Sequence, residues 1–295
     1  MKKFGKIIIA MLVLACLVGA CFALVACDPD KGASATRKIN MLNVELSSEQ
    51  YAFIFKQTDT ELKESVNAIL EEKATEVEAI ITKYLNASAE ELQSFGSEIQ
   101  TSATGAANEL VVATNAEFAP FEYFNGNKLA GIDIEIAQIL AAELGKTLVV
   151  EHMDFDAVVT SVQTQERYDI GMAALTISPD RAEVVDFSDP YFDTTQVLIT
   201  KADDYTFQYC TNADEVAEVL AGLKDSAAKC GGQRGTTGEF YMRGSADLGF
   251  AGYSNIQFEG YDSPTLAVQA MLDGNISFVV VDKAIAISLL KNFNA

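Results

Sequence analysis

The pattern of apolar and polar positions divides the chain into an apolar front, an amphipathic helical stretch and a long alternating region. In residues 61–84, apolar side chains recur at helical spacing among charged ones, which predicts one or two amphipathic helices. The preceding residues 50–55 have the composition of a strand. Residues 86–108 are rich in small and polar side chains, and we predict a surface connector there, with room for a short helix at 89–95.

From residue 109 onward, predicted strands alternate with predicted helices. In the first block, helices at 132–144 and 155–165 fall among strands at 110–114, 147–151, 168–173 and 196–200. The second block contains predicted strands at 250–253, 256–259 and 278–281, with helices at 213–223, 238–242, 264–272 and 283–291. Repeated alternation of this kind favours parallel βαβ units, so we predict the α/β class.

The apolar front is typical of an export signal, because residues 1–26 combine a lysine-containing start with a run of apolar residues. Leu24-Val25-Ala26-Cys27 resembles the lipobox of bacterial lipoproteins, and we expect cleavage before Cys27 and lipidation of its thiol. Cleavage before Cys21 is an alternative, and so is an uncleaved membrane anchor. Residues 27–36 then form a tether, and the body is predicted to be extracytoplasmic and lipid-anchored to the cell membrane.

Composition narrows the choice of partners. Forty-two acidic residues against 21 basic ones give a formal charge of −21, so the chain should repel nucleic acid. The hydrophobic fraction of 49% is enough for a substantial core. Cys210 and Cys230 are the cysteines outside the front segment; an exported protein could join them in a disulfide, or they could be two buried free thiols.

The sequence holds few of the motifs that bind cofactors or metals. It has no phosphate-binding GxxxxGK or GxGxxG and no CxxC pair, and His152 is its single histidine. A histidine-based triad or a multi-histidine metal site is therefore excluded, and we expect neither a cofactor nor a metal.

Three polar features follow predicted strands, where open α/β sheets gather ligands. Arg181 lies in the first turn of a predicted helix, where a bound carboxylate would match its guanidinium, although a neighbouring acid could pair with it instead. The loop 235–238, Gly-Thr-Thr-Gly, opens a helix and suits a small anion, or simply caps that helix. Asp282 could hold an ammonium or cap the following helix. Together the three match both ends of a zwitterionic α-amino acid.

Several longer motifs resemble the family 3 extracellular solute-binding proteins, the amino-acid receptors of ABC importers. They are Ala113-Thr-Asn-Ala-Glu-Phe-Ala-Pro-Phe-Glu-Tyr123, Gly131-Ile-Asp-Ile-Glu-Ile-Ala137, the stretches 168–170, 176–181 and 185–191, and the second-block motifs 235–238 and Val281-Asp282. These motifs stand in family order between residues 109 and 293. The resemblance implies a two-lobed, periplasmic-binding-protein-like (type II) fold with a ligand cleft between the lobes.

The order of the pieces predicts a circular permutation. Family members continue beyond the point at which this chain stops, and residues 46–84 resemble that missing closing segment. Lobe 1 would then comprise residues 37–200, with the moved segment at 37–85, the connector at 86–108 and the family's N-terminal part at 109–200. Lobe 2 would comprise residues 201–295, with one covalent crossover near 199–202. The alternative is an unrelated helical extension before a truncated receptor.

The resemblance also implies roles for individual residues. It places Arg181, Thr176 and Thr237 on the ligand α-carboxylate, and Asp282 and the Ala174 carbonyl on the α-ammonium. The remaining ligand-binding candidates are Asn115, Glu117, Phe118, Phe155, Gln233 and Thr236.

The side chain of the ligand is less constrained by these residues. Phe118 and Phe155 would pack against it. Asn115 occupies a place where relatives that bind basic amino acids often carry an acid, whereas Glu117 favours a basic ligand and Gln233 could add an amide contact. We therefore expect a polar or basic L-amino acid.

Binding rather than catalysis is the predicted function. The receptor would deliver a free L-amino acid to the permease of an ABC importer, acting as a monomer. A periplasmic dehydratase or an amino-acid sensor on the same fold is the alternative. An enzyme needs an acid or base beyond the residues that hold the zwitterion, and none can be assigned. A sensor needs a signalling domain or a second transmembrane segment, which this sequence does not contain.

Overall fold

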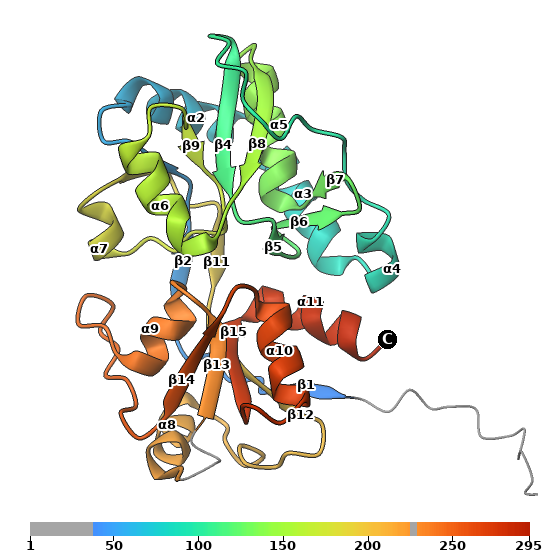
Figure 1. Cartoon of the computed structure of the whole chain (residues 1–295), viewed down its shortest axis with the longest axis vertical. Helices are drawn as coiled ribbons and strands as arrows, with labels where there is room; N and C mark the ends of the chain where they lie inside the picture. The colour runs from blue at the N-terminus through green and yellow to red at the C-terminus, as the bar shows by residue number, and fades with distance from the viewer. Residues whose placement is uncertain (1–37, 225–228) are drawn as a thin grey trace, which may run out of the picture. The chain divides into compact units, whose positions relative to one another are not determined.

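The structure, a computed structural model, describes residues 38–224 and 229–295. Arg37–Ala295 form one compact unit built on two five-stranded sheets (Figure 1). The predicted signal, the tether and Cys27 lie outside the described residues. Within the part of the chain that is described, no helix is long and apolar enough to cross a membrane.

The first sheet has the strand order β10-β3-β9-β4-β8. Its strands are β10 (Asp186–Phe187), β3 (Ile54–Phe55), β9 (Ile170–Gly171), β4 (Glu109–Thr114) and β8 (Thr147–His152). All six residues of β4 are buried, because the strand is covered on both faces. Leu110 and Val112 belong to the core shared with α5 (Ile132–Glu143), whereas Val111 and Ala113 belong to the core shared with α6 (Phe155–Thr164).

The second sheet has the order β1-β12-β15-β13-β14. Its strands are β1 (Ile39–Met41), β12 (Gln196–Lys201), β15 (Phe278–Asp282), β13 (Lys229–Gln233) and β14 (Gln257–Tyr261). Strand β13 is parallel to β14 and β15, whereas β12 is antiparallel to β15. One core contains α8 (Ala213–Gly222) and α9 (Thr237–Arg243); the other contains α10 (Pro264–Leu272) and α11 (Lys283–Phe293).

The remaining elements extend these two layers. Strands β5 (Glu117–Phe118), β6 (Glu122–Asn125) and β7 (Lys128–Ala130) form a small antiparallel sheet, and β2 (Glu49–Tyr51) pairs with β11 (Phe192–Thr194). The predicted amphipathic stretch forms two helices, α2 (Thr60–Glu72) and α3 (Ala74–Asn86). Two short helices, α4 (Ala89–Leu92) and α7 (Pro179–Ala182), complete the set. Helix α3 packs beside α5, so the front segment contributes to the first lobe.

Two covalent segments connect the sheets, not the single crossover expected from the sequence. One runs from β1 through β2 to β3, and the other runs from β11 to β12. Strand β1 pairs with β12, and β12 pairs with β15, so both belong to the second sheet although the sequence analysis assigned residues 37–200 to the first lobe. Short apolar strands fit either sheet equally well, and the pairing partner decides between them.

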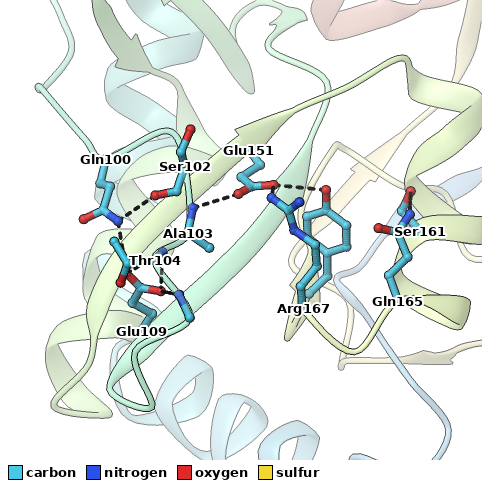
Figure 2. A network of polar contacts seen from close by, with 11 residues as sticks. Gln100, Ser102, Ala103, Thr104, Glu109, Glu151, Ser161, Gln165 and Arg167 are labelled. Atoms are coloured by element: carbon cyan, nitrogen blue, oxygen red, sulfur yellow. Dashed lines mark hydrogen bonds and ion pairs between the residues drawn. The ribbon is translucent and has the colours of Figure 1, made fainter.

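The connector 86–108 is held against the first sheet by two carboxylates at strand positions (Figure 2). Glu109 accepts hydrogen bonds from the backbone N–H groups of Thr104 and Gly105 and from the Gln100 side chain. Glu151 accepts from the Ala103 backbone at 2.8 Å and pairs with Arg167. The connector is therefore an ordered strap rather than a free linker.

The structure also answers two further expectations, a strand at 250–253 and the state of the two cysteines. Residues 250–253 do not form the predicted strand; Phe250 makes only an isolated bridge with Ser245. Cys210 and Cys230 are both free thiols, and Cys230 is fully buried, where burial raises the pKa of its thiol.

Candidate functional site

Eight of the eleven predicted ligand-binding residues line one small cavity. They are Phe118, Phe155, Ala174, Thr176, Arg181, Thr236, Thr237 and Asp282. The cavity has a volume of about 10 Å³, roughly the space of a single water molecule. The site is thus nearly filled by its own side chains, so these side chains must separate to admit an amino acid.

Arg181 is the cation of this site. The residue is 7% exposed, and its guanidinium donates hydrogen bonds to the carbonyls of Thr176, at 2.8 Å, and Gly235, at 3.0 Å. Gly235 has a φ of +74°, a left-handed conformation that glycine adopts easily. Burial lowers the pKa of Arg181, while Asp180, Glu49 and Asp282 oppose that shift. The guanidinium lies 5.6 Å from the ring centre of Phe155.

Asp282 is the predicted ammonium partner. It stands at the N-cap of α11, yet its side chain makes no capping hydrogen bond. The residue is 3% exposed, and its Oδ1 atom has no hydrogen-bond partner among the described residues. Burial, followed by the charge of Glu49, raises the pKa of Asp282 to about 7. A buried carboxylate with an unpaired oxygen is strongly stabilised by a cationic group on a ligand.

Glu49, which the sequence analysis did not select, also belongs to the site. It is 5% exposed, and its Oε2 atom accepts hydrogen bonds from Thr237 Oγ1 at 2.6 Å and from Thr176 Oγ1 at 2.9 Å. Ser47 Oγ donates to Oε1 at 2.6 Å. The signal in the sequence is alternation, because in β2 Glu49 and Tyr51 face inward while Gln50 faces outward.

Ala174 occupies a strained backbone conformation beside the cavity. Its φ is +46°, the single positive value outside glycine in the described chain, and such values concentrate at functional sites. Its N–H donates to Asp133 Oδ2 at 2.9 Å, and Tyr191 donates to Asp133 Oδ1 at 2.6 Å. Burial raises the pKa of Asp133 to about 7. Asp133 thereby holds the backbone N–H of the residue whose own carbonyl is predicted to face the ammonium.

The three other predicted ligand-binding residues do not line this cavity. Gln233 Nε2 donates to Asn115 Oδ1 at 2.8 Å, so the two amides are joined to each other. Glu117 is exposed and borders a different hollow, which also involves Ala119 and Leu266.

A larger hollow of about 710 Å³ lies beside the two crossovers. Its two lysines are already engaged. Lys283 donates to Glu45, and Lys291 donates to the carbonyls of Leu85 and Ala87. We therefore centre the functional description on the smaller cavity, where two carboxylates and a guanidinium are buried together.

Two α/β lobes joined by two crossovers, with a cation and carboxylates buried between them, define the class of two-lobed binding proteins. The chain belongs to the bacterial extracellular solute-binding proteins, family 3, whose model matches residues 110–287. The family resemblance inferred from the sequence motifs is thus confirmed. As a member of a solute-binding family, the protein is a binder rather than an enzyme.

Individual relatives and solved structures agree with this assignment. The arginine-binding extracellular protein ArtP of Bacillus subtilis is 34% identical over 95 residues, which is 32% of this chain but only 37% of that protein. A probable histidine-binding protein of Neisseria gonorrhoeae is 27% identical over 72% of this chain and 74% of its own. The arginine-bound form of a truncated ArgBP from T. maritima matches with a TM-score of 0.51 at 31% identity, covering 61% of this chain and 76% of that chain. The two-lobed α/β fold is therefore confirmed.

Proposed function

We propose that this protein captures a polar or basic L-amino acid between its lobes and delivers it to an ABC importer. The observation that carries the proposal is the burial of Arg181 and Asp282 at one cavity, with the buried Glu49 bonded to two threonines that line it. A zwitterion supplies both a carboxylate for the guanidinium and an ammonium for the carboxylates. Charge-assisted hydrogen bonds of this kind are strongest where water is excluded.

Arg181 would hold the α-carboxylate, and Asp282 with the Ala174 carbonyl would hold the α-ammonium. Arg181 and Ala174 belong to the first lobe, whereas Asp282 and Thr237 belong to the second. A ligand that contacts both lobes stabilises their closed arrangement, which is the form that a permease could recognise.

Among the possible ligands, we favour an amino acid with a basic side chain. Relatives and solved neighbours are named for arginine, histidine and cystine. Within the site, Glu49 and Asp282 are acidic and Arg181 alone is basic, so a cationic amino acid would improve the local charge balance. Phe118 and Phe155 would pack against its aliphatic stem.

Anchoring is a separate part of the proposal. The lipobox-like stretch before Cys27 favours a lipid anchor on that thiol, with residues 27–36 as a tether to the membrane. Mass spectrometry of the protein purified from membranes tests this directly: a diacylglycerol-modified Cys27 at the N-terminus supports it, and an unmodified N-terminus contradicts it.

We further propose that the chain is a circular permutant of its family. Strand β3 from the front segment lies inside the first sheet, and the family model begins only at residue 110. The chain's end also lies beside the front segment: Lys38 N and Ile39 N donate to Asn294 Oδ1 at 2.8 and 3.1 Å. In the ordinary family order, the chain would run directly from the segment that ends here at Ala295 into the segment that begins here near residue 37.

Reordering the gene tests the permutation. A chain that runs from residue 109 to Ala295, continues through a short linker into residues 37–108 and then ends keeps the whole connector and moves only the chain ends. It should fold and bind the same ligand with closely similar affinity, because surface connectors tolerate such cuts. Thermal unfolding and calorimetry compare it with the natural order. A soluble but non-binding or molten product would contradict the permutation.

The amino-acid specificity is tested by a thermal-shift screen of the common L-amino acids against the full chain. Ligand binding stabilises the native state by mass action, so a ligand present at about 100 times its Kd should raise stability by about 2.7 kcal/mol. We expect the largest shift with arginine or another basic or polar amino acid. A panel without any shift would contradict the proposed function.

A further inference from the structure

Glu49 carries an inference that rests on the proposed function and concerns the recognition of the ligand's amino group. The residue comes from the crossover strand β2, outside the stretch matched by the family model. Its carboxylate is nonetheless bonded to one threonine from each lobe, Thr176 and Thr237. Glu49 thus links the first crossover to both halves of the site.

The protons of both threonine hydroxyls are committed to Glu49. A hydroxyl has one proton to donate and can accept two hydrogen bonds. Thr176 Oγ1 and Thr237 Oγ1 both donate to Glu49 Oε2, and Thr237 Oγ1 also accepts from Gln196 Nε2 at 3.1 Å. While these bonds last, neither hydroxyl can donate to a ligand carboxylate. The lone pairs of Thr176 Oγ1 stay available to accept from an ammonium.

The charge around the cavity also favours an ammonium on this side. Glu49 and Asp282 are both buried, and no ion pair with Lys or Arg involves either of them across residues 38–224 and 229–295. Two N–H donors of Arg181 are engaged in hydrogen bonds to the carbonyls of Thr176 and Gly235. The Glu49 side of the cavity therefore offers acceptors and negative charge.

We propose that Glu49 is a positioning residue that makes this subsite selective for an ammonium. By holding the two hydroxyl protons, it presents the Thr176 oxygen as an acceptor beside Asp282 and leaves the ligand carboxylate to Arg181. A ligand that lacks the α-amino group would leave these acceptors unpaired, which carries a large penalty in a buried site. Without the Glu49 charge, the hydroxyls could turn and donate to a carboxylate instead.

The test compares L-arginine with its analogue lacking the α-amino group, by calorimetry on the full chain. In Glu49→Gln, the wild-type preference for L-arginine over the analogue should fall by roughly tenfold or more. Glu45→Gln is the matched control, since Glu45 lies in the same crossover, is exposed and pairs with Lys283. It should leave the preference unchanged.

A second variant separates this role from general support of the fold. If Glu49 acts through the hydroxyl of Thr176, then Thr176→Val should lower the same preference, and the double variant should lose less than the two single losses combined. Equal weakening of both ligands in Glu49→Gln, or an unchanged preference, would overturn the inference while leaving the proposed function intact. Absence of L-arginine binding in the wild type, together with no response to other amino acids, would overturn both.

Discussion

Arg181→Ala should abolish amino-acid binding. The guanidinium is buried in the cavity and is the one Arg or Lys side chain among the residues lining it. Removing one partner of a buried charge pair typically costs about 3–5 kcal/mol, and the affinity should therefore fall by about 100-fold or more. Isothermal titration calorimetry with L-arginine measures the loss.

Arg243→Ala provides the matched control for this experiment. Arg243 is half-exposed and pairs with Glu239 on the same helix, α9, away from the cavity lining. Because exposed pairs of this kind contribute little, its removal should leave affinity nearly unchanged. Unchanged affinity in Arg181→Ala, with both variants folded by circular dichroism, would refute the role assigned to Arg181.

Ligand affinity should fall as the pH is lowered through the neutral range. Burial and the neighbouring Glu49 raise the pKa of Asp282 to about 7 in the free protein, while a bound ammonium favours the ionised carboxylate. Below this pKa, binding must expel a proton, so affinity should drop by up to about tenfold per pH unit. Between about pH 8 and about pH 5, the expected loss for L-arginine is therefore roughly 100-fold.

Asp282→Asn separates this effect from the titration of other groups, among them Asp133, which holds the Ala174 N–H and whose pKa is also raised to about 7. The amide cannot ionise, so the variant should bind weakly but with a much flatter pH profile. A flat profile in the wild type, or an equally steep one in Asp282→Asn, would show that Asp282 does not control binding.

Much of the fold follows from local patterns. The amphipathic spacing of residues 61–84 predicts the region of α2 and α3, and the apolar runs at 110–114 and 278–281 predict β4 and β15. These segments bury one helix face or a whole strand, and such burial produces an apolar pattern that can be recognised in the sequence. Arg181 and Asp282 are selected because they follow predicted strands, where open α/β sheets gather ligands, and because a cation in the first turn of a helix is poorly matched to the helix dipole.

One interior strand of the second sheet, β13, could not be found in this way. Strand β13 reads Lys-Cys-Gly-Gly-Gln, a composition that suggests a turn. The two glycines are required by close packing: a Cβ atom on Gly231 would lie 2.5 Å from Ile276 Cδ1, and one on Gly232 would lie 3.0 Å from the Val280 carbonyl oxygen. Residues 250–253 show the opposite error. Their aromatic side chains suggest a strand, but the backbone there is irregular.

Glu49 illustrates a limit set by topology. Its neighbours Ser47 and Ser48 suggest a turn, and local spacing contains no information that this crossover passes through the ligand site. The alternation of Glu49 and Tyr51 shows an inward face, but only the tertiary arrangement shows that Thr176 and Thr237 lie on that face. Contacts that join residues more than 100 positions apart depend on the whole fold.

The central claim is that a free amino acid binds between the lobes through Arg181 and Asp282. Calorimetric titration of the full chain with L-arginine at about pH 8, where most of Asp282 is ionised, tests it most directly. The account predicts saturable binding of one ligand per chain, lost in Arg181→Ala and retained in Arg243→Ala. Absence of binding by L-arginine and by every other common L-amino acid would contradict it.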